Sequence, residues 1–164
     1  MAPFALKGLG FAHKTEAGAV RLGVRDLAGQ AEMPGATGYL VEEMVSGAVA
    51  EVIIGALRDP VYGVTLTLGP GGILAELLAD TVTLIAPVGG PEIEAGLRRL
   101  RLWPLLCGYR GRPAADVGAI VAAALALQEV MLGDRALSEI EINPLMVRSN
   151  GAIAVDALAR KDET

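Results

Sequence analysis

Apolar and acidic residues alternate over residues 139–142, a pattern that is typical of a half-buried β-strand. Further along, Asn150-Gly151 is the strongest short-range signal of a β-hairpin, and residues 152–155 form the apolar run of a returning strand. The hairpin folds two strand ends back beside each other. We therefore expect Asn143 and Asp156, which flank the hairpin, to lie close together.

The rest of the chain predicts short strands and two helices. Apolar residues recur at helical spacing over residues 91–102 and again over residues 114–132, with Asp116 in the first turn of the second helix. This order of elements indicates an α/β or α+β protein that forms one folded unit over residues 1–164. The expected strands cover residues 4–8, 19–24, 39–44, 50–58, 64–68, 82–86, 137–142, 145–147 and 152–155.

Composition restricts the class of protein. Hydrophobic residues make up 52% of the chain and aromatic residues 4%, so the core must be built from small aliphatic side chains. A net charge of -5 argues against a nucleic-acid surface. The single Cys107 excludes an internal disulfide and fits the reducing cytoplasm. The most apolar stretch, residues 117–132, contains Gln128 and Glu129 and is shorter than the roughly 20 residues of a membrane span.

Three oxygen-bearing side chains could converge beside the hairpin. Glu141 lies two residues before Asn143, on the same side of a regular strand, and Asp156 approaches from the returning strand. Such a set suits Mg²⁺, which takes one or two protein carboxylates while phosphate oxygens complete its shell. The pattern indicates a nucleoside triphosphate site. The alternative, an acidic solvated strand face followed by an Asn-Pro turn, stays open from these residues alone.

Two glycine-containing loops carry further candidate chemistry. The backbone amides of Gly71 and Gly72, after a predicted strand, could approach a phosphate where a side chain would not fit. The alternative is a simple turn. Arg110 and Arg112 lie between turn residues and could hold phosphate or carboxylate groups in bidentate fashion, or form an exposed basic loop.

Acidic residues and the only histidine provide the remaining candidates. Glu42, Glu43 and Glu51 stand at strand ends, where they could accept the hydroxyls of a ribose or simply contact solvent. His13 lies near Lys14 and Thr15, residue types that surround a transferred phosphate, although a structural or surface role is the alternative.

Taken in order, these segments resemble the ATP-grasp domain of the nucleoside-diphosphate-forming acyl-CoA synthetases. That family includes ADP-forming acetyl-CoA synthetase and is related to the β subunit of succinyl-CoA synthetase. The resemblance implies an α+β ATP-grasp fold with a mixed or antiparallel sheet and flanking helices. Only residues 24–37 separate two matching segments, which indicates either a shortened lid subdomain or a segment that is missing from the sequence as given. The matching runs include A-H-K-T-E-A-G-A-V, G-Y-L-V-E-E-M-V, G-P-G-G-I-L-A-E-L-L-A-D, P-L-L-C-G-Y-R-G-R-P and E-I-E-I-N-P-L.

The resemblance assigns roles to matching residues. Lys7 would contact the ATP phosphates, Glu42 and Glu43 would line the adenine and ribose pocket, and Asn143 and Asp156 would hold Mg²⁺. The remaining nucleotide-binding candidates are Glu51, Gly71, Gly72 and Arg110.

Two further roles concern the carrier histidine. Glu141 would steady a phosphorylated histidine that arrives from a partner domain, and His13 would be a second phosphate carrier between that histidine and ADP.

The reaction implied by the resemblance is reversible. Acyl-CoA, ADP and phosphate give a free acid, CoA and ATP through acyl phosphate and phosphohistidine intermediates. The chain would supply the half that binds ATP or ADP and Mg²⁺, as a fragment or subunit of a larger, oligomeric synthetase. CoA-binding and carrier-histidine domains would be its partners. Two alternatives stay open: a non-catalytic scaffold with the same fold, and an ATP-grasp ligase that joins a carboxylate to an amine.

Overall fold

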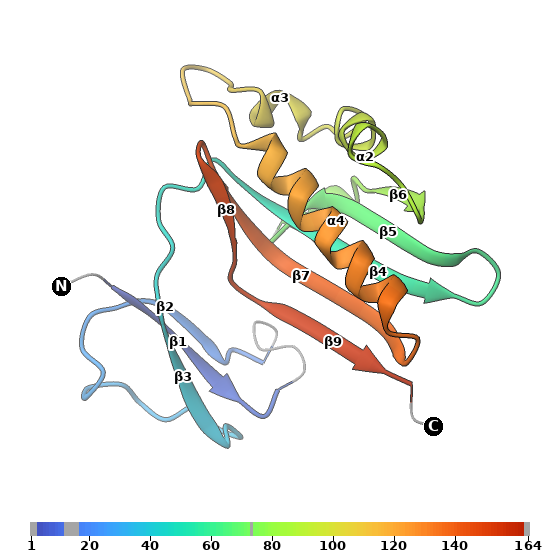
Figure 1. Cartoon of the computed structure of the whole chain (residues 1–164). Helices are drawn as coiled ribbons and strands as arrows, with labels where there is room; N and C mark the ends of the chain where they lie inside the picture. The colour runs from blue at the N-terminus through green and yellow to red at the C-terminus, as the bar shows by residue number, and fades with distance from the viewer. Residues whose placement is uncertain (1–2, 12–16, 73, 163–164) are drawn as a thin grey trace. The chain divides into compact units, whose positions relative to one another are not determined.

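The computed structural model describes residues 3–11, 17–72 and 74–162, and the chain divides into two compact units, Met1–Ser46 and Gly47–Thr164. The assignment of residues 1–164 to one domain stays a prediction. In the described residues the two units have separate sheets that share no strand, and each sheet has its own buried apolar cluster. Figure 1 shows the three strands of the first unit in blue to cyan and the strands of the second in green and orange-red.

The first unit is a small antiparallel sheet. Its strands β1 (Phe4–Leu9), β2 (Val20–Val24) and β3 (Gly38–Glu43) lie in the order β2-β1-β3. Strand β1 is central, and its Lys7 lies opposite Leu40 of β3. The buried apolar cluster consists of Leu6, Ala19, Val24 and Met33.

The second unit is a six-stranded sheet with its two longest helices packed on one face. The strand order is β6-β5-β4-β7-β8, with β9 also paired to β7, and all described pairs are antiparallel. The strands are β4 (Ala50–Asp59), β5 (Gly63–Pro70), β6 (Val82–Ile85), β7 (Leu137–Arg148), β8 (Gly151–Ala154) and β9 (Ala157–Lys161). The helices are α1 (Leu74–Leu78), α2 (Gly90–Leu97), α3 (Trp103–Leu106) and α4 (Val117–Gly133).

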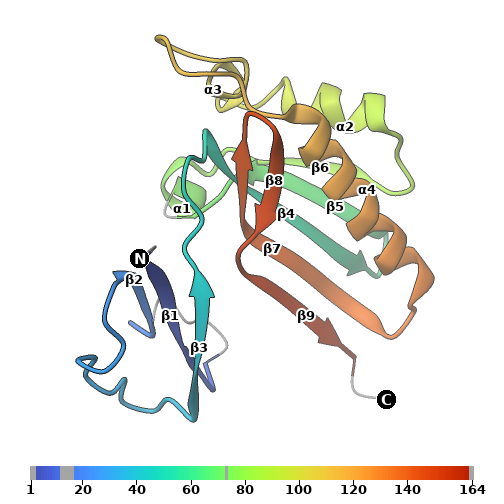
Figure 2. The same cartoon turned by 60° about the vertical axis from the view of Figure 1, so that its left-hand side comes forward.

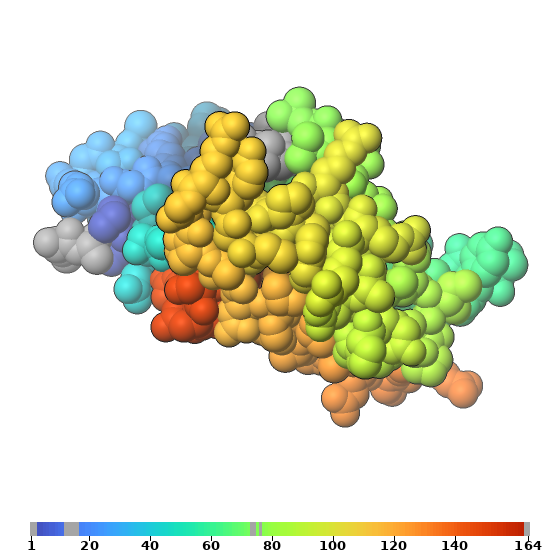
Figure 3. Space-filling model, turned by 90° about the horizontal axis from the view of Figure 1, so that it is seen from above, coloured from blue at the N-terminus to red at the C-terminus, as the bar shows by residue number. Residues whose placement is uncertain are grey.

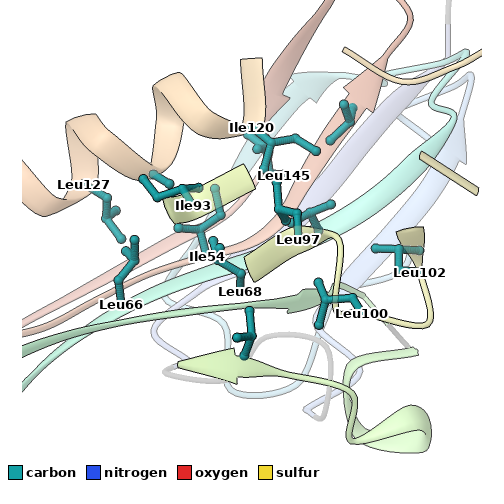
Figure 4. Close-up of a cluster of buried hydrophobic side chains, with 14 of the residues drawn as sticks. Ile54, Leu66, Leu68, Ile93, Leu97, Leu100, Leu102, Ile120, Leu127 and Leu145 are labelled. Atoms are coloured by element: carbon teal, nitrogen blue, oxygen red, sulfur yellow. The ribbon is translucent and has the colours of Figure 1, made fainter. Parts of the chain in front are cut away.

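The main core lies between this sheet and its helices. Along β4, Val52, Ile54 and Ala56 are buried at alternate positions, as a strand with one covered face requires. Figure 4 shows Ile54, with Leu66 and Leu68 of β5, pointing toward Ile93 and Ile120 of the helices. Helices α2 and α4 lie on the same side of the sheet in Figure 2, and Figure 3 looks onto the yellow and orange layer that they form with α3.

Helix α4 is held at both ends by polar groups. Asp116 is its N-cap rather than part of its first turn, and the carboxylate accepts a hydrogen bond from Ala119 N at 2.9 Å. At the other end, the Arg58 guanidinium of β4 donates to the carbonyls of Met131 (2.6 Å), Asp134 (3.1 Å) and Leu137 (3.0 Å). The Met131 carbonyl lies in the last turn of α4, where a carbonyl has no partner inside the helix, and the other two lie just beyond it.

Several elements differ from the sequence-based expectations. The first predicted helix ends at Leu97, and the apolar residues Leu100 and Leu102 are buried in the turns that follow it. The strands expected over residues 137–142 and 145–147 are one strand, β7. Helices α1 and α3 and strand β9 were not expected. No helix within the described residues is long and apolar enough to cross a membrane.

Candidate functional site

The candidate site is built around a break in the pairing of β7. The first half of β7 pairs with β9, up to Ile142 opposite Ala157, and the last four residues pair with β8. At the break, Asn143 N donates to Asp156 O at 3.1 Å, and Val155 N donates to Pro144 O at 3.2 Å. The predicted hairpin is confirmed, and it places Asn143 beside Asp156.

On its other edge, β7 carries a β-bulge at the same point. Val52 of β4 lies opposite Leu145 and Ile54 lies opposite Ile142, so the two residues Asn143 and Pro144 face a single residue of β4. A bulge interrupts the strict alternation of side chains and redirects the residue that it contains. The bulge, and not the regular alternation of the strand, therefore sets the position of Asn143.

The turn between β5 and α1 reaches Asn143. Gly72 N donates to Asn143 Oδ1 at 2.9 Å, and Gly71 N donates to Glu51 O at 2.9 Å. The second unit thus brings five predicted site residues together: Glu51, Gly71, Gly72, Asn143 and Asp156. Both glycine amides donate to acceptors within the protein, whereas the sequence suggested that they would face a phosphate.

Both glycines of this turn lie where a side chain would not fit. A Cβ added to Gly71 would lie 2.7 Å from the backbone carbon of Val52, and a Cβ on Gly72 would collide with Glu51 Oε2. Gly72 also has a φ of 59°, in the left-handed region. The sequence suggested that a phosphate would come close to these glycines. In this structure, β4 comes close to them.

Glu141 lies on the sheet face that is turned away from α2 and α4. It is half-buried, and its neighbours across the ladders are Gly55 of β4 and Leu158 of β9. Glu51 lies four residues before Gly55 on β4. Alternate residues of a strand share a face, so the carboxylates of Glu51 and Glu141 both belong to this face. The adjacent Ile140 and Ile142 pack against the core on the opposite face.

The donor set at Asn143 and Asp156 fits Mg²⁺. Both side chains offer hard oxygen atoms, and the hydrogen bond between their backbones holds the two residues together. Within the described residues, no group of three or more His, Cys, Asp or Glu side chains could hold a metal ion. A cation at Asn143 and Asp156 would thus need further oxygen atoms from water or a bound molecule, as Mg²⁺ takes from phosphates.

In the first unit, Lys7 and Glu42 form an ion pair. Lys7 Nζ lies 2.6 Å from Glu42 Oε2, and the Lys7 side chain is only 9% exposed. A buried ammonium requires such a partner, because desolvation of an unpaired charge is costly. Glu43, at the end of β3, lies opposite Phe4 and is exposed.

Arg110 belongs to the exposed loop after α3. Its guanidinium lies over the ring of Tyr109, 5.2 Å from the ring centre, and its own φ is 50°. Among the described residues, no hydrogen bond or ion pair joins Arg110 to the turn at Gly72. His13, the predicted phosphate carrier, lies outside the described residues.

Sequence reasoning missed the contact between Gly72 and Asn143. The two residues are 71 positions apart, and no local pattern near either one signals the other. The two segments had been singled out separately, each for a different reason. Only the pairing of β4 with both β5 and β7 brings them together.

Comparisons with known proteins agree with this fold. A model of the ATP-grasp domain family matches residues 2–160. Over 158 residues the chain is 30% identical to the beta subunit of acetate–CoA ligase [ADP-forming] I from Pyrococcus furiosus, covering 88% of this chain and 68% of that subunit. It is 36% identical over 123 residues to trans-feruloyl-CoA synthase from an unknown prokaryotic organism, covering 74% of this chain and 17% of the synthase.

A solved structure is similar over almost the whole chain. The dinucleotide-forming acetyl-coenzyme A synthetase 1 of Candidatus Korarchaeum cryptofilum, in complex with coenzyme A and Mg-AMPPCP, superposes with a TM-score of 0.83 at 28% identity. The superposition covers 98% of this chain and 76% of that one. In that complex the phosphohistidine segment points towards the nucleotide-binding site. The predicted fold class is confirmed.

Proposed function

Because the chain belongs to the ATP-grasp domain family, we propose that it is the nucleotide half of a nucleoside-diphosphate-forming acyl-CoA synthetase. It binds ATP or ADP with Mg²⁺ and transfers phosphate between the nucleotide and a phosphohistidine of a partner domain. The observation that carries this proposal is the placement of Asn143 beside Asp156 at the break in β7, next to the glycine turn.

The roles of the second unit follow from its oxygen atoms. Asn143 and Asp156 hold Mg²⁺, which supplies positive charge to stabilise the phosphoryl group during transfer. Glu51, at the same turn, contacts the nucleotide. Glu141 is a carboxylate on the face away from the helices and steadies the phosphohistidine that the partner presents.

The roles proposed in the first unit concern the nucleotide as well. Lys7 donates to the phosphates, with its charge balanced by Glu42 before the nucleotide binds. Glu42 and Glu43 line the adenine and ribose pocket, and His13 carries phosphate between the partner histidine and ADP. Arg110 adds a guanidinium for an anionic group.

Other domains are needed for the complete reaction. The chain spans 68% of the Pyrococcus furiosus subunit and 17% of the feruloyl-CoA synthase, and the Korarchaeum complex contains coenzyme A and a phosphohistidine segment. We accordingly assign CoA binding and the primary carrier histidine to partner domains or subunits in an oligomeric, cytoplasmic assembly.

Thermal unfolding with magnesium-ATP tests the proposal. A ligand at 100 times its dissociation constant stabilises a protein by about 2.7 kcal/mol, which should raise the Tm of this chain by roughly 5 to 10 °C. The Asn143→Ala, Asp156→Ala double variant should lose the shift. An Asp162→Ala variant, altered at an exposed aspartate outside the hairpin, should keep it.

Two outcomes would contradict the proposal. If neither the natural chain nor the double variant is stabilised by magnesium-ATP, the chain is better described as a scaffold with the ATP-grasp fold. An equal shift in both proteins would mean that nucleotide binds without Asn143 and Asp156.

A further inference from the structure

The hydrogen bond from Gly72 N to Asn143 Oδ1 connects the glycine turn to a proposed metal ligand. It is 2.9 Å long and partly buried. Asn143 has two chemically different ends, a carbonyl oxygen that accepts hydrogen bonds and an amino group that donates them. Because a donor cannot bond to a donor, the Gly72 amide selects the orientation in which the carbonyl oxygen faces the turn.

The turn that supplies this donor is itself fixed in place. Gly71 N is bonded to Glu51 O, which ties the turn to β4. The backbone of Val52 leaves no room for a Cβ at Gly71, and the end of the Glu51 side chain fills the corresponding position at Gly72. The first helical turn of α1 begins directly afterwards, with Ala75 N bonded to Gly72 O at 3.2 Å. The Gly72 amide is thus held on both sides.

A carbonyl oxygen has two lone pairs, so Asn143 Oδ1 can accept from Gly72 and still bind a cation. Partners of this kind orient metal ligands, and their loss typically lowers metal affinity by about 10- to 100-fold. We propose that Gly72 is a positioning residue that orients the Asn143 carboxamide for Mg²⁺ through its backbone N–H. This inference rests on the proposed role of Asn143 as a magnesium ligand.

Hydrogen exchange tests the contact without any nucleotide. The Gly72 amide should be protected from exchange in the natural chain. Protection should be lost in Asn143→Ala and retained in Asn143→Asp, whose carboxylate still accepts the bond. Equal exchange of the Gly72 amide in the natural chain and in Asn143→Ala would overturn the inference, because the amide would then be protected by something else.

Nucleotide affinity tests the consequence for magnesium. Gly72→Ala places a methyl group against the end of the Glu51 side chain, which must move, and strains a backbone with a φ of 59°, which favours a shift of the turn. We expect the affinity for magnesium-ADP to fall by about 10- to 100-fold more than the affinity for ADP measured in EDTA, which reports any effect of the displaced Glu51 side chain alone. Combined with Asn143→Ala, the glycine change should have little further effect.

Gly63→Ala is the matched control. Gly63 is the first residue of β5 and has a φ of 76°, and a Cβ there would meet nothing within 4 Å, so only the backbone strain is shared. This variant should bind magnesium-ADP as the natural chain does. Equal losses of affinity with and without magnesium in Gly72→Ala, or full additivity with Asn143→Ala, would show a general structural effect and overturn the proposal.

Different results would contradict the positioning role of Gly72 and the proposed function. If the natural chain binds magnesium-ADP and the Gly72 and Asn143 effects are additive, the positioning role is wrong and the proposed function stands. If the natural chain binds no magnesium-ADP while Asn143 still protects the Gly72 amide, the proposed function is wrong, and the positioning role for magnesium is overturned with it.

Discussion

The two units of this chain use very different means to stay folded. Among the described residues, the buried cluster of the first unit contains four apolar side chains, whereas that of the second contains 22. The first unit is 46 residues long, a size at which a single small core gives marginal stability. It also buries a lysine in an ion pair. The second unit is therefore the more stable of the two, and the first depends more on polar contacts.

Removing core volume from the second unit should have the largest effect. Ile54 is fully buried between the sheet and the helices, so Ile54→Ala should lower the free energy of unfolding by about 2–5 kcal/mol. Amide exchange should accelerate across β4, β5 and β7 while that of β1 to β3 stays the same. Denaturant unfolding followed by hydrogen exchange measures both. Equal acceleration in both units would mean that they unfold together, which would remove the contrast between them.

The next largest effect should come from Arg58. Its guanidinium bonds three carbonyls at the end of α4, and such charge-assisted bonds stabilise more than neutral ones. Arg58→Ala should lower the free energy of unfolding by about 2–3 kcal/mol, and Arg58→Lys should recover only part of it because an ammonium lacks the planar fork. Urea titration measures the difference. A lysine variant as stable as the natural chain would show that charge alone suffices.

In the first unit, the corresponding polar contact is the pair of Lys7 and Glu42. Glu42→Gln removes the charge that balances a buried ammonium, so it should destabilise this unit by about 1–2 kcal/mol. Exchange of the β1 amides should accelerate while the second unit is unaffected. The neighbouring exposed Glu43→Gln is the control and should change little. If both glutamine variants behave alike, the ion pair does not stabilise the unit.

The smallest expected effect concerns pH. The pKa of Asp134 lies below its ordinary value of 3.8, chiefly because the Ala136 N–H donates to its carboxylate and also because Lys161 lies 3.1 Å away. The folded state therefore favours the ionised form. This stabilisation is complete above the ordinary pKa and is lost as the pH falls through the lowered value.

Thermal unfolding of Asp134→Asn across acidic pH measures this contribution. The variant should have a slightly lower Tm than the natural chain at pH 7, and the difference should vanish in strong acid. Asp162→Asn, at an exposed position near the end of the chain, serves as the control. A difference that grows on acidification would contradict the assigned sign.

Local patterns predicted most elements well, and the exceptions have physical causes. Two strands were expected around residues 143 and 144 because Asn-Pro is a strong turn signal. The structure has one strand, since Pro144 lies in a bulge where its missing N–H interrupts no regular ladder. Strand β9 has a charged end and was not predicted. It pairs with the part of β7 that extends beyond β8.

The segments of the candidate site were predicted separately, without the contacts between them. The hairpin signal at Asn150-Gly151 correctly brought Asn143 to Asp156, because a tight turn sets the register of the strands that it joins. The approach of a phosphate to the glycine pair at Gly71 and Gly72 stays a prediction, and the structure shows what this pair contacts within the protein. Its neighbour is β4, and its hydrogen bond goes to Asn143.

The amino-acid sequence by itself determined the strands, the long apolar helix and the hard oxygen donors, because these depend on the period of side chains and on turns of a few residues. Only the tertiary structure decided that Gly72 donates to Asn143 and that Arg58 holds the end of α4. Those contacts join residues more than 70 positions apart, and they exist because antiparallel pairing sets β4 between β5 and β7.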